Sequence, residues 1–501
     1  MTTLWGLVEQ QAEARSETLI AVDEHGNELT FLGAHDAALR MAKGLHGLGL
    51  GRDDVVSWQL PNWLDAIVLT LALSRLQVTQ NPIVAILGER EVGFIARQAR
   101  SKLLIVPRQH GKFDYVTMAT EIAARTEGVT PLAVSPGDFP SGDFPSGDGE
   151  LPVFVDEPAD TVRWLFYTSG TTADPKGARH TDRTLIAGAR GFVEALGLTD
   201  RDRVSGLLPL THIGGIIHVI AALITGAPMV VAASFDPEKT IEYLREQRAT
   251  TIPGAMPFVH AYFAYQDRHP EVTTMFPNAR VMTHGGSPKP PTLHYEAKRR
   301  IGTAGIVSGY GMTECPMSIW NRPEDADVDL ANTEGTPVTG VELRIVDGEV
   351  RVRGPQLMLG YVDSSLDEDA FDAEGFFCSG DLGVIDQRGR LTITGRLKDI
   401  IIRNMENISA TELENLIHPH PKVREVAVIG VPNETTGEIA CAVLVPADHS
   451  DPPTLAELCE HLLAEGISSR KLPERLELVD KLPRNAMDKL LKNELRKRYG
   501  S

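Results

Sequence analysis

Apolar positions along the first part of the chain alternate between two spacings. Residues 34–48 carry apolar side chains at helical spacing, and the short apolar run 55–60 reads as a strand. The same alternation recurs in a predicted helix over 66–76 and a predicted buried strand over 103–106. Helices that alternate with buried strands are typical of an α/β fold, in which helices cover a sheet.

Two further segments need composition as well as periodicity to be interpreted. Residues 213–233 contain no Asp, Glu, Lys or Arg and nearly reach the length of a membrane span. His218 and the break at 226–228 (Gly-Ala-Pro) favour instead a buried helix, a turn and a strand, so we expect no membrane span. Residues 135–150 repeat the unit Gly-Asp-Phe-Pro-Ser, a composition that does not build a core, and we predict an exposed loop there.

The pattern changes near residue 397, and the rest of the chain reads as a compact α+β unit. Residues 409–412 (Ser-Ala-Thr-Glu) predict a capping box that begins a short helix, and residues 454–457 (Thr-Leu-Ala-Glu) predict the cap of another helix. The second helix should bury leucines 455, 458, 462 and 463, and a charged helix is expected over 490–499. Strands are predicted over 423–431 and 440–445. We therefore predict a large N-terminal domain over 1–397 and a small C-terminal domain over 398–501.

Composition narrows the classes of function. The chain has 501 residues, more than one core usually supports. Its formal net charge of −19 disfavours binding to nucleic acid or to an anionic membrane. The four cysteines form no CxxC pair, so the sequence predicts neither a zinc site nor a disulfide framework. With no signal-peptide pattern at the N-terminus, we expect a cytoplasmic protein.

The strongest chemical signal is the stretch 167–177, Tyr-Thr-Ser-Gly-Thr-Thr-Ala-Asp-Pro-Lys-Gly. Its glycines let a backbone approach closely, its hydroxyls and amides donate, and Lys176 supplies positive charge, so the loop can surround a polyphosphate. It follows the apolar run 162–166, and a helix is predicted from about Thr184. This predicts the strand–loop–helix context of a phosphate loop. The loop does not end in the Gly-Lys-Ser/Thr of the common P-loop, so by itself it is weak evidence for a phosphate site.

Further motifs follow in a fixed order. After the segment 285–288 (Gly-Gly-Ser-Pro) comes 309–314 (Gly-Tyr-Gly-Met-Thr-Glu), whose tyrosine can lie on a flat base and whose Thr-Glu pair can contact phosphate and hold Mg²⁺. Taken alone, this stretch could equally be a tight turn with a core tyrosine. Asp381, on a turn flanked by glycines, is suited to accept hydrogen bonds from ribose hydroxyls, although alone it would read as a surface turn. The last two stretches are 395–408 and 482–489.

Together these motifs resemble the adenylate-forming superfamily, which contains acyl-CoA synthetases, nonribosomal-peptide adenylation domains and firefly-type luciferases. The resemblance covers nearly the whole chain and is strongest from Thr168 to Lys489. It implies an AMP-forming ligase that uses ATP and Mg²⁺. A carboxylate attacks the α-phosphate to give an acyl-adenylate and pyrophosphate, and a thiol, usually CoA, then displaces AMP.

The implied fold is α/β. A large N-terminal domain of layered α/β sheets carries a β-barrel-like subdomain, and a small mobile α+β C-terminal domain carries the catalytic lysine. In this family the small domain rotates between the two half-reactions.

The resemblance also implies roles for individual residues. The β- and γ-phosphates would be held by Thr168, Ser169, Gly170, Thr171, Thr172 and Lys176. The adenine would be lined by Gly286, Ser287, Pro288 and Tyr310, and Gly309, Gly311 and Met312 complete the nucleotide-binding set. Thr313 would contact the α-phosphate, Glu314 would hold Mg²⁺, and Asp381 would bind the ribose with Arg396 nearby. Lys398 matches the hinge position, and Lys489 would bridge the carboxylate and the α-phosphate. His212 matches a position between the acyl pocket and the thiol tunnel.

The chain departs from the family pattern at three places. Ala173 replaces a glycine of the phosphate loop, and Asp488 replaces the glycine before Lys489, which brings a negative charge beside the lysine. Asn404 and Met405 stand where glycines line the pantetheine tunnel, and the Met405 side chain would project into it.

These departures leave the acceptor open. One alternative keeps CoA, with an adjusted tunnel. The other is a non-CoA acceptor, as in the ATP-dependent diazotases of actinobacterial secondary metabolism, which are thought to activate nitrite and pass it to an aromatic amine. A nucleotide-binding protein without turnover is a third reading, disfavoured because Lys489, Glu314 and Asp381 are retained.

The partners expected from sequence are a small-molecule acid and its acceptor. The acid pocket should draw on residues 212–217, 256–262, 283–284 and 317, a mixed polar and apolar set that favours a small or medium-sized acid over a long fatty acid. A homodimer is expected only from the family.

Overall fold

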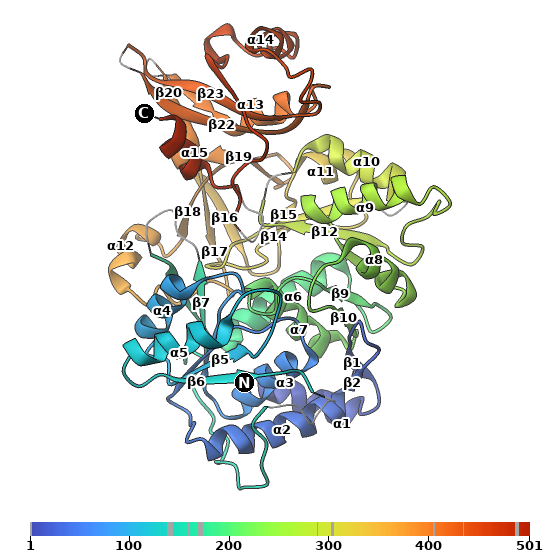
Figure 1. Cartoon of the computed structure of the whole chain (residues 1–501), viewed down its shortest axis with the longest axis vertical. Coiled ribbons are helices and arrows are strands. Elements are labelled where there is room, and N and C mark those ends of the chain that lie inside the picture. The colour runs from blue at the N-terminus through green and yellow to red at the C-terminus, as the bar shows by residue number, and fades with distance from the viewer. Residues whose placement is uncertain are drawn as a thin grey trace.

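The computed structural model describes residues 3–137, 144–158, 160–168, 174–287, 289–301, 305–403, 406–433, 435–485 and 490–500. These residues form two large sheets with covering helices, a smaller antiparallel sheet, and an α+β unit from the last fifth of the chain (Figure 1). The α/β fold class predicted from the sequence is confirmed.

One large sheet has six described strands in the order β6-β5-β3-β4-β7-β8. They are β3 (Val55–Trp58), β4 (Thr79–Pro82), β5 (Leu103–Pro107), β6 (Thr130–Val134), β7 (Trp164–Thr168) and β8 (Lys176–His180). All neighbours in this order are parallel except β7 and β8, which form an antiparallel pair. Helices α4 (Glu89–Gln98) and α5 (Tyr115–Arg125) pack on this sheet through an apolar cluster.

The other large sheet has nine described strands in the order β15-β14-β13-β12-β11-β9-β10-β1-β2. Its strands are β1 (Leu19–Val22), β2 (Glu28–Thr30), β9 (Val204–Gly206), β10 (Met229–Val231), β11 (Thr251–Pro253), β12 (Val281–Gly285), β13 (Ile306–Tyr310), β14 (Ile319–Trp320) and β15 (Thr336–Pro337). Four helices lie between successive strands of this sheet: α8 (Pro237–Glu246), α9 (Met256–Arg268), α10 (Pro291–Ile301) and α11 (Asp327–Asn332). The parallel β12–β13 pair aligns Gly285 with Gly309.

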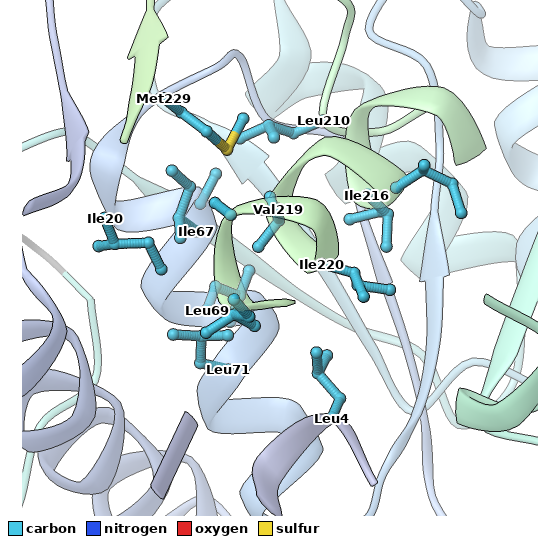
Figure 2. Packing of buried hydrophobic residues seen from close by; sticks show 14 of the residues in the cluster. Leu4, Ile20, Ile67, Leu69, Leu71, Leu210, Ile216, Val219, Ile220 and Met229 are labelled. Atoms are coloured by element: carbon cyan, nitrogen blue, oxygen red, sulfur yellow. The ribbon is translucent and has the colours of Figure 1, made fainter. Parts of the chain in front are cut away.

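The main hydrophobic core lies where five helices meet the two large sheets. They are α1 (Leu4–Ala14), α2 (Phe31–Gly47), α3 (Leu64–Arg75), α6 (Asp182–Leu196) and α7 (Ile213–Thr225). Figure 2 shows side chains of α3, among them Ile67, and of α7, among them Val219, pointing toward one another with Ile20 and Met229 beside them.

The segment 213–233 folds as predicted, into helix α7, a turn and strand β10. Gly226 ends α7 with φ of +81°, where a Cβ atom would lie 2.4 Å from the Arg15 guanidinium. Among the described residues, no helix is long and apolar enough to cross a membrane.

The smaller sheet is antiparallel, with four described strands in the order β16-β17-β18-β19, and the predicted barrel-like subdomain stays a prediction. Its strands are β16 (Glu342–Val346), β17 (Glu349–Arg353), β18 (Phe377–Ile385) and β19 (Leu391–Arg396). The short helix α12 (Asp367–Ala370) lies in the connection between β17 and β18.

The last fifth of the chain forms one sheet, and its side chains build apolar clusters with those of three helices. Its elements are β20 (Ile400–Arg403), β21 (Glu406–Ser409), α13 (Ala410–Ile417), β22 (Val423–Asn433), β23 (Gly437–Pro446), α14 (Leu455–Ala464), β24 (Arg475–Leu478) and α15 (Lys492–Tyr499). The position of the domain boundary, 397/398, stays a prediction.

Three local predictions need correction. Ser409 caps α13, but the Glu412 carboxylate accepts from Lys471 Nζ at 2.8 Å, so the predicted capping box is only half formed. Leu463 is 48 % exposed, so it does not belong to the buried face of α14. The loop 135–150 is not fully exposed, because Phe144 is buried in the core. Next to it, the backbone of Pro145 lies over Gly44 of α2, where a Cβ atom would approach to 2.4 Å.

Candidate active site

The predicted phosphate loop joins two strands of a hairpin. Thr168, at the end of β7, pairs with Lys176, at the start of β8. Helix α6 begins only at Asp182, after β8, and is capped by Thr181. The predicted strand–loop–helix context is therefore wrong, because an antiparallel strand intervenes. Phosphates at this loop would be held by the loop itself and Lys176 rather than by the first turn of a helix.

Lys176 is linked to the predicted metal ligand through one aromatic ring. Its Nζ lies 5.5 Å from the centre of the Tyr361 ring, within the range of a cation–π contact. The Tyr361 hydroxyl donates to Glu314 Oε1 at 2.7 Å. The glutamate predicted to hold Mg²⁺ and the lysine predicted to hold phosphate thus contact the hydroxyl and the ring of the same buried tyrosine.

The Thr313–Glu314 turn is held from β8 as well. His180 Nε2 lies 2.8 Å from the Thr313 carbonyl, which can only accept, so this nitrogen carries the proton and donates. Burial lowers the His180 pKa to about 4, so the ring is neutral near pH 7. The Met358 amide also donates to the Glu314 carbonyl, at 2.8 Å. The residues after the phosphate loop therefore anchor the predicted α-phosphate and metal ligands.

A second cluster joins the predicted base and ribose residues. The Tyr310 hydroxyl donates to Asp381 Oδ2 at 2.9 Å, and Arg396 Nε lies 2.7 Å from Asp381 Oδ1. Asp381 is 6 % exposed, and burial raises the pKa of the Tyr310 hydroxyl, so Tyr310 stays a donor. Resemblance placed Arg396 near the ribose site, and the structure brings these three side chains together.

The predicted location of Asp381 on a turn is wrong, because it lies within strand β18 opposite Arg396 of β19. Gly380 takes φ of +69°, and its amide donates to Glu349 Oε1 at 3.0 Å. The register between β18 and β19 shifts just beyond, between Leu382 and Gly383. This irregularity disturbs the strand locally, which explains why the sequence resembles a turn.

The glycines of the predicted adenine site are required by close contacts. A Cβ atom on Gly309 would lie 2.2 Å from the Trp320 ring, and one on Gly311 would lie 2.7 Å from the Met317 amide. Gly286 has φ of +80°, which favours glycine. Because β12 and β13 are paired, the segment Gly285–Ser287 lies beside the Gly309–Tyr310 motif, as the shared role in base binding requires.

The turn after β12 is anchored by two buried basic side chains. His284 lies between the carbonyls of Gly254, at 3.1 Å, and Ser287, at 2.8 Å. Burial and the Lys289 charge lower the pKa of His284 to about 4. Lys289 Nζ donates to the Leu330 and Ala331 carbonyls near the end of α11. A cation at that position also interacts favourably with the helix dipole.

His212 caps helix α7, and its hydrogen bond is to the first turn of that helix rather than to a residue of the predicted nucleotide site. Its Nδ1 accepts from the Gly214 amide at 3.1 Å, so the proton of the neutral ring is on Nε2. Burial lowers its pKa to about 4. The neighbouring Thr211 hydroxyl is buried without a hydrogen-bond partner among the described residues, so it adds a polar group beside His212.

Lys398, the predicted hinge residue, lies in a 3₁₀ turn over Leu397–Asp399. Burial, followed by the Arg396 charge, lowers its pKa. The next residue, Asp399, accepts from Arg496 of α15 at 2.7 Å, and Arg496 also approaches the Lys398 carbonyl at 3.4 Å. The last helix of the chain is therefore attached beside the predicted hinge.

Several predicted residues lie outside the part of the chain that the structure describes. They are Ser169, Gly170, Thr171, Thr172, Ala173, Pro288, Asn404, Met405, Asp488 and Lys489. Their roles stay predictions.

The described donor set fits a magnesium ion that is held mainly by its nucleotide. No group of three or more His, Cys, Asp or Glu side chains that could hold a metal exists among the described residues. Mg²⁺ in phosphoryl chemistry is bound by one or two carboxylates together with the phosphates of the nucleotide. Glu314 can provide such a carboxylate.

Sequence reasoning missed Tyr361 and His180. Tyr361 follows Gly360, whose φ of +114° marks a special backbone site, but a Gly-Tyr pair is a weak signal by itself. His180 follows the phosphate loop by four residues and carries no distinguishing pattern. Both became visible only through their contacts with the 313–314 turn.

Comparison with known proteins assigns both parts of the chain. A family model described as AMP-binding enzyme matches residues 8–362, and one described as AMP-binding enzyme C-terminal domain matches residues 412–489. The medium-chain fatty-acid–CoA ligase of Escherichia coli K12 is 29 % identical over 98 % of this chain and 89 % of that protein. The long-chain-fatty-acid–CoA ligase FadD13 of Mycobacterium tuberculosis is 32 % identical over 94 % of this chain and 93 % of that protein.

Solved structures match over the full length. ATP-bound MatB from Rhodopseudomonas palustris is 27 % identical, with a TM-score of 0.88 over 100 % of this chain and 99 % of that one. Apo MatB from the same organism is 28 % identical and superposes less closely, with a TM-score of 0.77 over 99 % of both chains. MenE from Bacillus subtilis, in complex with ATP and a magnesium ion, is 26 % identical, with a TM-score of 0.84 over 99 % of both chains.

Proposed function

Because the chain belongs to the AMP-binding enzyme family and is an AMP-forming ligase similar to acyl-CoA synthetases, we propose that it adenylates a small or medium-sized acid and transfers the acyl group to CoA. The observation that carries this proposal is the convergence of four distant segments. Direct side-chain contacts join these segments, which are β8, the 309–314 motif, the residues around 361 and the β18–β19 pair.

Each described residue supports a step of the first half-reaction. Lys176 would neutralise charge on the leaving pyrophosphate, and Glu314 would hold Mg²⁺, which would offset charge on the phosphate oxygens. Asp381 would accept from the ribose, and Tyr310 would support the base. None of these side chains acts as a covalent nucleophile, so the rate enhancement would come from positioning and electrostatic stabilisation of the α-phosphate.

The arrangement of the whole chain favours the adenylation step. It superposes more closely on the ATP-bound form of MatB than on the apo form. We infer that the C-terminal part stands in an orientation that suits the first half-reaction, in which Lys489 would bridge the carboxylate and the α-phosphate. In that role Lys489 would contact the carboxylate of the acid directly, and the negative charge of Asp488 would raise the pKa of the Lys489 ammonium.

CoA is the acceptor that the relatives favour, and Met405 is the observation that favours a different one. A methionine in place of a glycine would narrow a pantetheine tunnel, whereas an amine acceptor needs no tunnel. A diazotase, which passes activated nitrite to an aromatic amine, is therefore the second candidate.

Pyrophosphate release measured with a panel of acids, with and without CoA, tests the proposal. Acid-dependent release that CoA stimulates, together with a thioester detected by mass spectrometry, would support CoA ligation and exclude the diazotase. Release that requires nitrite and an arylamine, without a thioester, would exclude CoA ligation. ATP binding without any pyrophosphate release would leave only a nucleotide-binding role.

A further inference from the structure

The most informative unassigned residue in the site is Tyr361. Its side chain is 4 % exposed and lies between two groups of opposite charge, Lys176 and Glu314. The Lys176 ammonium faces the ring at 5.5 Å, and the hydroxyl donates to the Glu314 carboxylate at 2.7 Å. One side chain therefore contacts both the predicted phosphate-binding lysine and the predicted metal ligand.

The backbone holds Tyr361 firmly in this position. Residues 359–362 run beside β8, with hydrogen bonds from the Leu359 amide to the Arg179 carbonyl and from the Val362 amide to the Gly177 carbonyl. The Tyr361 amide also donates to Asp367 Oδ1 at 2.7 Å. A Cβ atom on Gly360 would lie 2.5 Å from the Asp367 carboxylate, so this approach requires glycine. The tyrosine is thus attached to the strand that carries Lys176.

The phenol is suited to keep the two charges apart. The Tyr361 hydroxyl donates to Glu314 Oε1 at 2.7 Å, and a carboxylate oxygen can only accept. The hydroxyl restrains the carboxylate, and the ring offers the ammonium a negative π face. Lys176 contacts the ring and Glu314 contacts the hydroxyl, so one side chain engages both opposite charges.

We propose that Tyr361 is a positioning residue that orients Glu314 toward the metal and keeps Lys176 free for the phosphates of ATP. This inference rests on the proposed function, because it takes Glu314 as the ligand of Mg²⁺. In this proposal Tyr361 contacts neither the acid nor the α-phosphate, and it acts through Glu314 and Lys176. Its removal should therefore change how much Mg²⁺ improves ATP binding.

The test is the affinity for ATP, measured by calorimetry in excess EDTA and again in saturating Mg²⁺, which needs neither the acid nor the acceptor. Tyr361→Phe removes only the hydroxyl and keeps the ring. We expect its ATP affinity in EDTA to stay near that of the wild type. The Mg²⁺-dependent gain should fall about tenfold, the lower end for a hydrogen bond to a charged group. Tyr361→Leu also removes the ring, and we expect it to weaken ATP binding in EDTA too, because Lys176 can then pair with Glu314.

Tyr243→Phe is the matched control. Tyr243 is also buried, and its hydroxyl donates to the Val22 carbonyl at 2.8 Å, on helix α8. This variant loses a buried tyrosine hydrogen bond elsewhere, so it should lower the thermal midpoint without altering the effect of Mg²⁺. If Tyr243→Phe reproduces the effect of Tyr361→Phe, the role of Tyr361 is only structural and the inference fails.

The remaining outcomes separate the inference from the function on which it rests. If Mg²⁺ improves ATP binding equally in the wild type and in Tyr361→Phe, the inference is wrong and the proposed function stands. If the variant gains more from Mg²⁺ than the wild type, the phenol competes with the metal, which also overturns the inference. If Mg²⁺ does not improve ATP binding by the wild type, the metal role of Glu314 fails and the inference fails with it.

Discussion

Replacing Asp381 with asparagine should remove most of the enzyme's preference for a ribose over a deoxyribose. Asp381 is buried in strand β18 and accepts from the Tyr310 hydroxyl at 2.9 Å and from Arg396 Nε at 2.7 Å. We propose that the carboxylate also accepts from the ribose hydroxyls of ATP. Asparagine keeps the size of the side chain, removes the charge and replaces one acceptor oxygen with a donor.

The size of the effect follows from these contacts. A hydrogen bond to a charged group contributes about 1.5–3 kcal/mol, and asparagine loses at least one such bond to the nucleotide. At about 1.4 kcal/mol per factor of ten, ATP binding should weaken about ten- to hundredfold. The Arg396 side chain is 36 % exposed, so the lost ion pair itself should cost only about 1 kcal/mol of stability.

The assay compares ATP with 2′-deoxy-ATP and 3′-deoxy-ATP by calorimetry in the presence of Mg²⁺. The wild type should prefer ATP, and Asp381→Asn should bind all three with similar affinity. An Asp381→Asn variant that discriminates as strongly as the wild type would refute the assignment of this carboxylate to the ribose.

Asp202→Asn provides a matched control outside the motifs. Asp202 pairs with Arg280 Nε at 2.8 Å and accepts from the Thr250 hydroxyl at 2.8 Å. The exposure of its ion pair is almost the same, 36 % for Arg280 and 6 % for Asp202. This variant should lose comparable stability and keep the wild-type preference for ATP.

Three further predictions concern other parts of the chain. Lys489→Ala should lower acid-dependent pyrophosphate release at least about a hundredfold while sparing transfer from a preformed adenylate; equal losses in both steps would contradict the proposed role. Met405→Gly should raise CoA-dependent turnover several-fold if the side chain narrows the tunnel, and an unchanged rate of thioester formation would show that it does not. Burial raises the pKa of Asp65 to about 6, so the folded state binds this proton more tightly than the unfolded chain and its stabilising contribution is lost as pH rises through 6. The stability that Asp65→Asn gains over the wild type should therefore grow between about pH 4 and about pH 6, to at most about 3 kcal/mol, and stay level above about pH 7; a difference that does not grow over that range would contradict this.

Much of the fold follows from local pattern. The helices near 34–48 and 66–76, the segment 213–233 and the strands of the C-terminal unit were predictable because each buries one face, or its whole length, at a regular spacing. The phosphate loop, the 309–314 motif and Asp381 were predictable as a set because their order along the chain is informative even where each motif is weak.

The errors occur where a local pattern has two solutions. The residues after the phosphate loop could continue directly into a helix, and in the structure they first form β8, which pairs with β7. Asp381 beside glycines resembles a turn, and partner strands on both sides keep it extended. Phe144 lies in a repeat that predicts exposure, and packing into the main hydrophobic core buries it.

The sequence by itself determined the family, the reaction class and most of the elements, because periodicity and motif order are properties of neighbouring residues. Only the tertiary structure decided how the site is assembled. It places Tyr310 against Asp381, which are 71 residues apart, and sets Tyr361 between Lys176 and Glu314. The physical reason is that strand pairing and core packing bring these segments together, and the charge and hydrogen-bonding capacity of each side chain acquire a function only from the partner that this packing supplies.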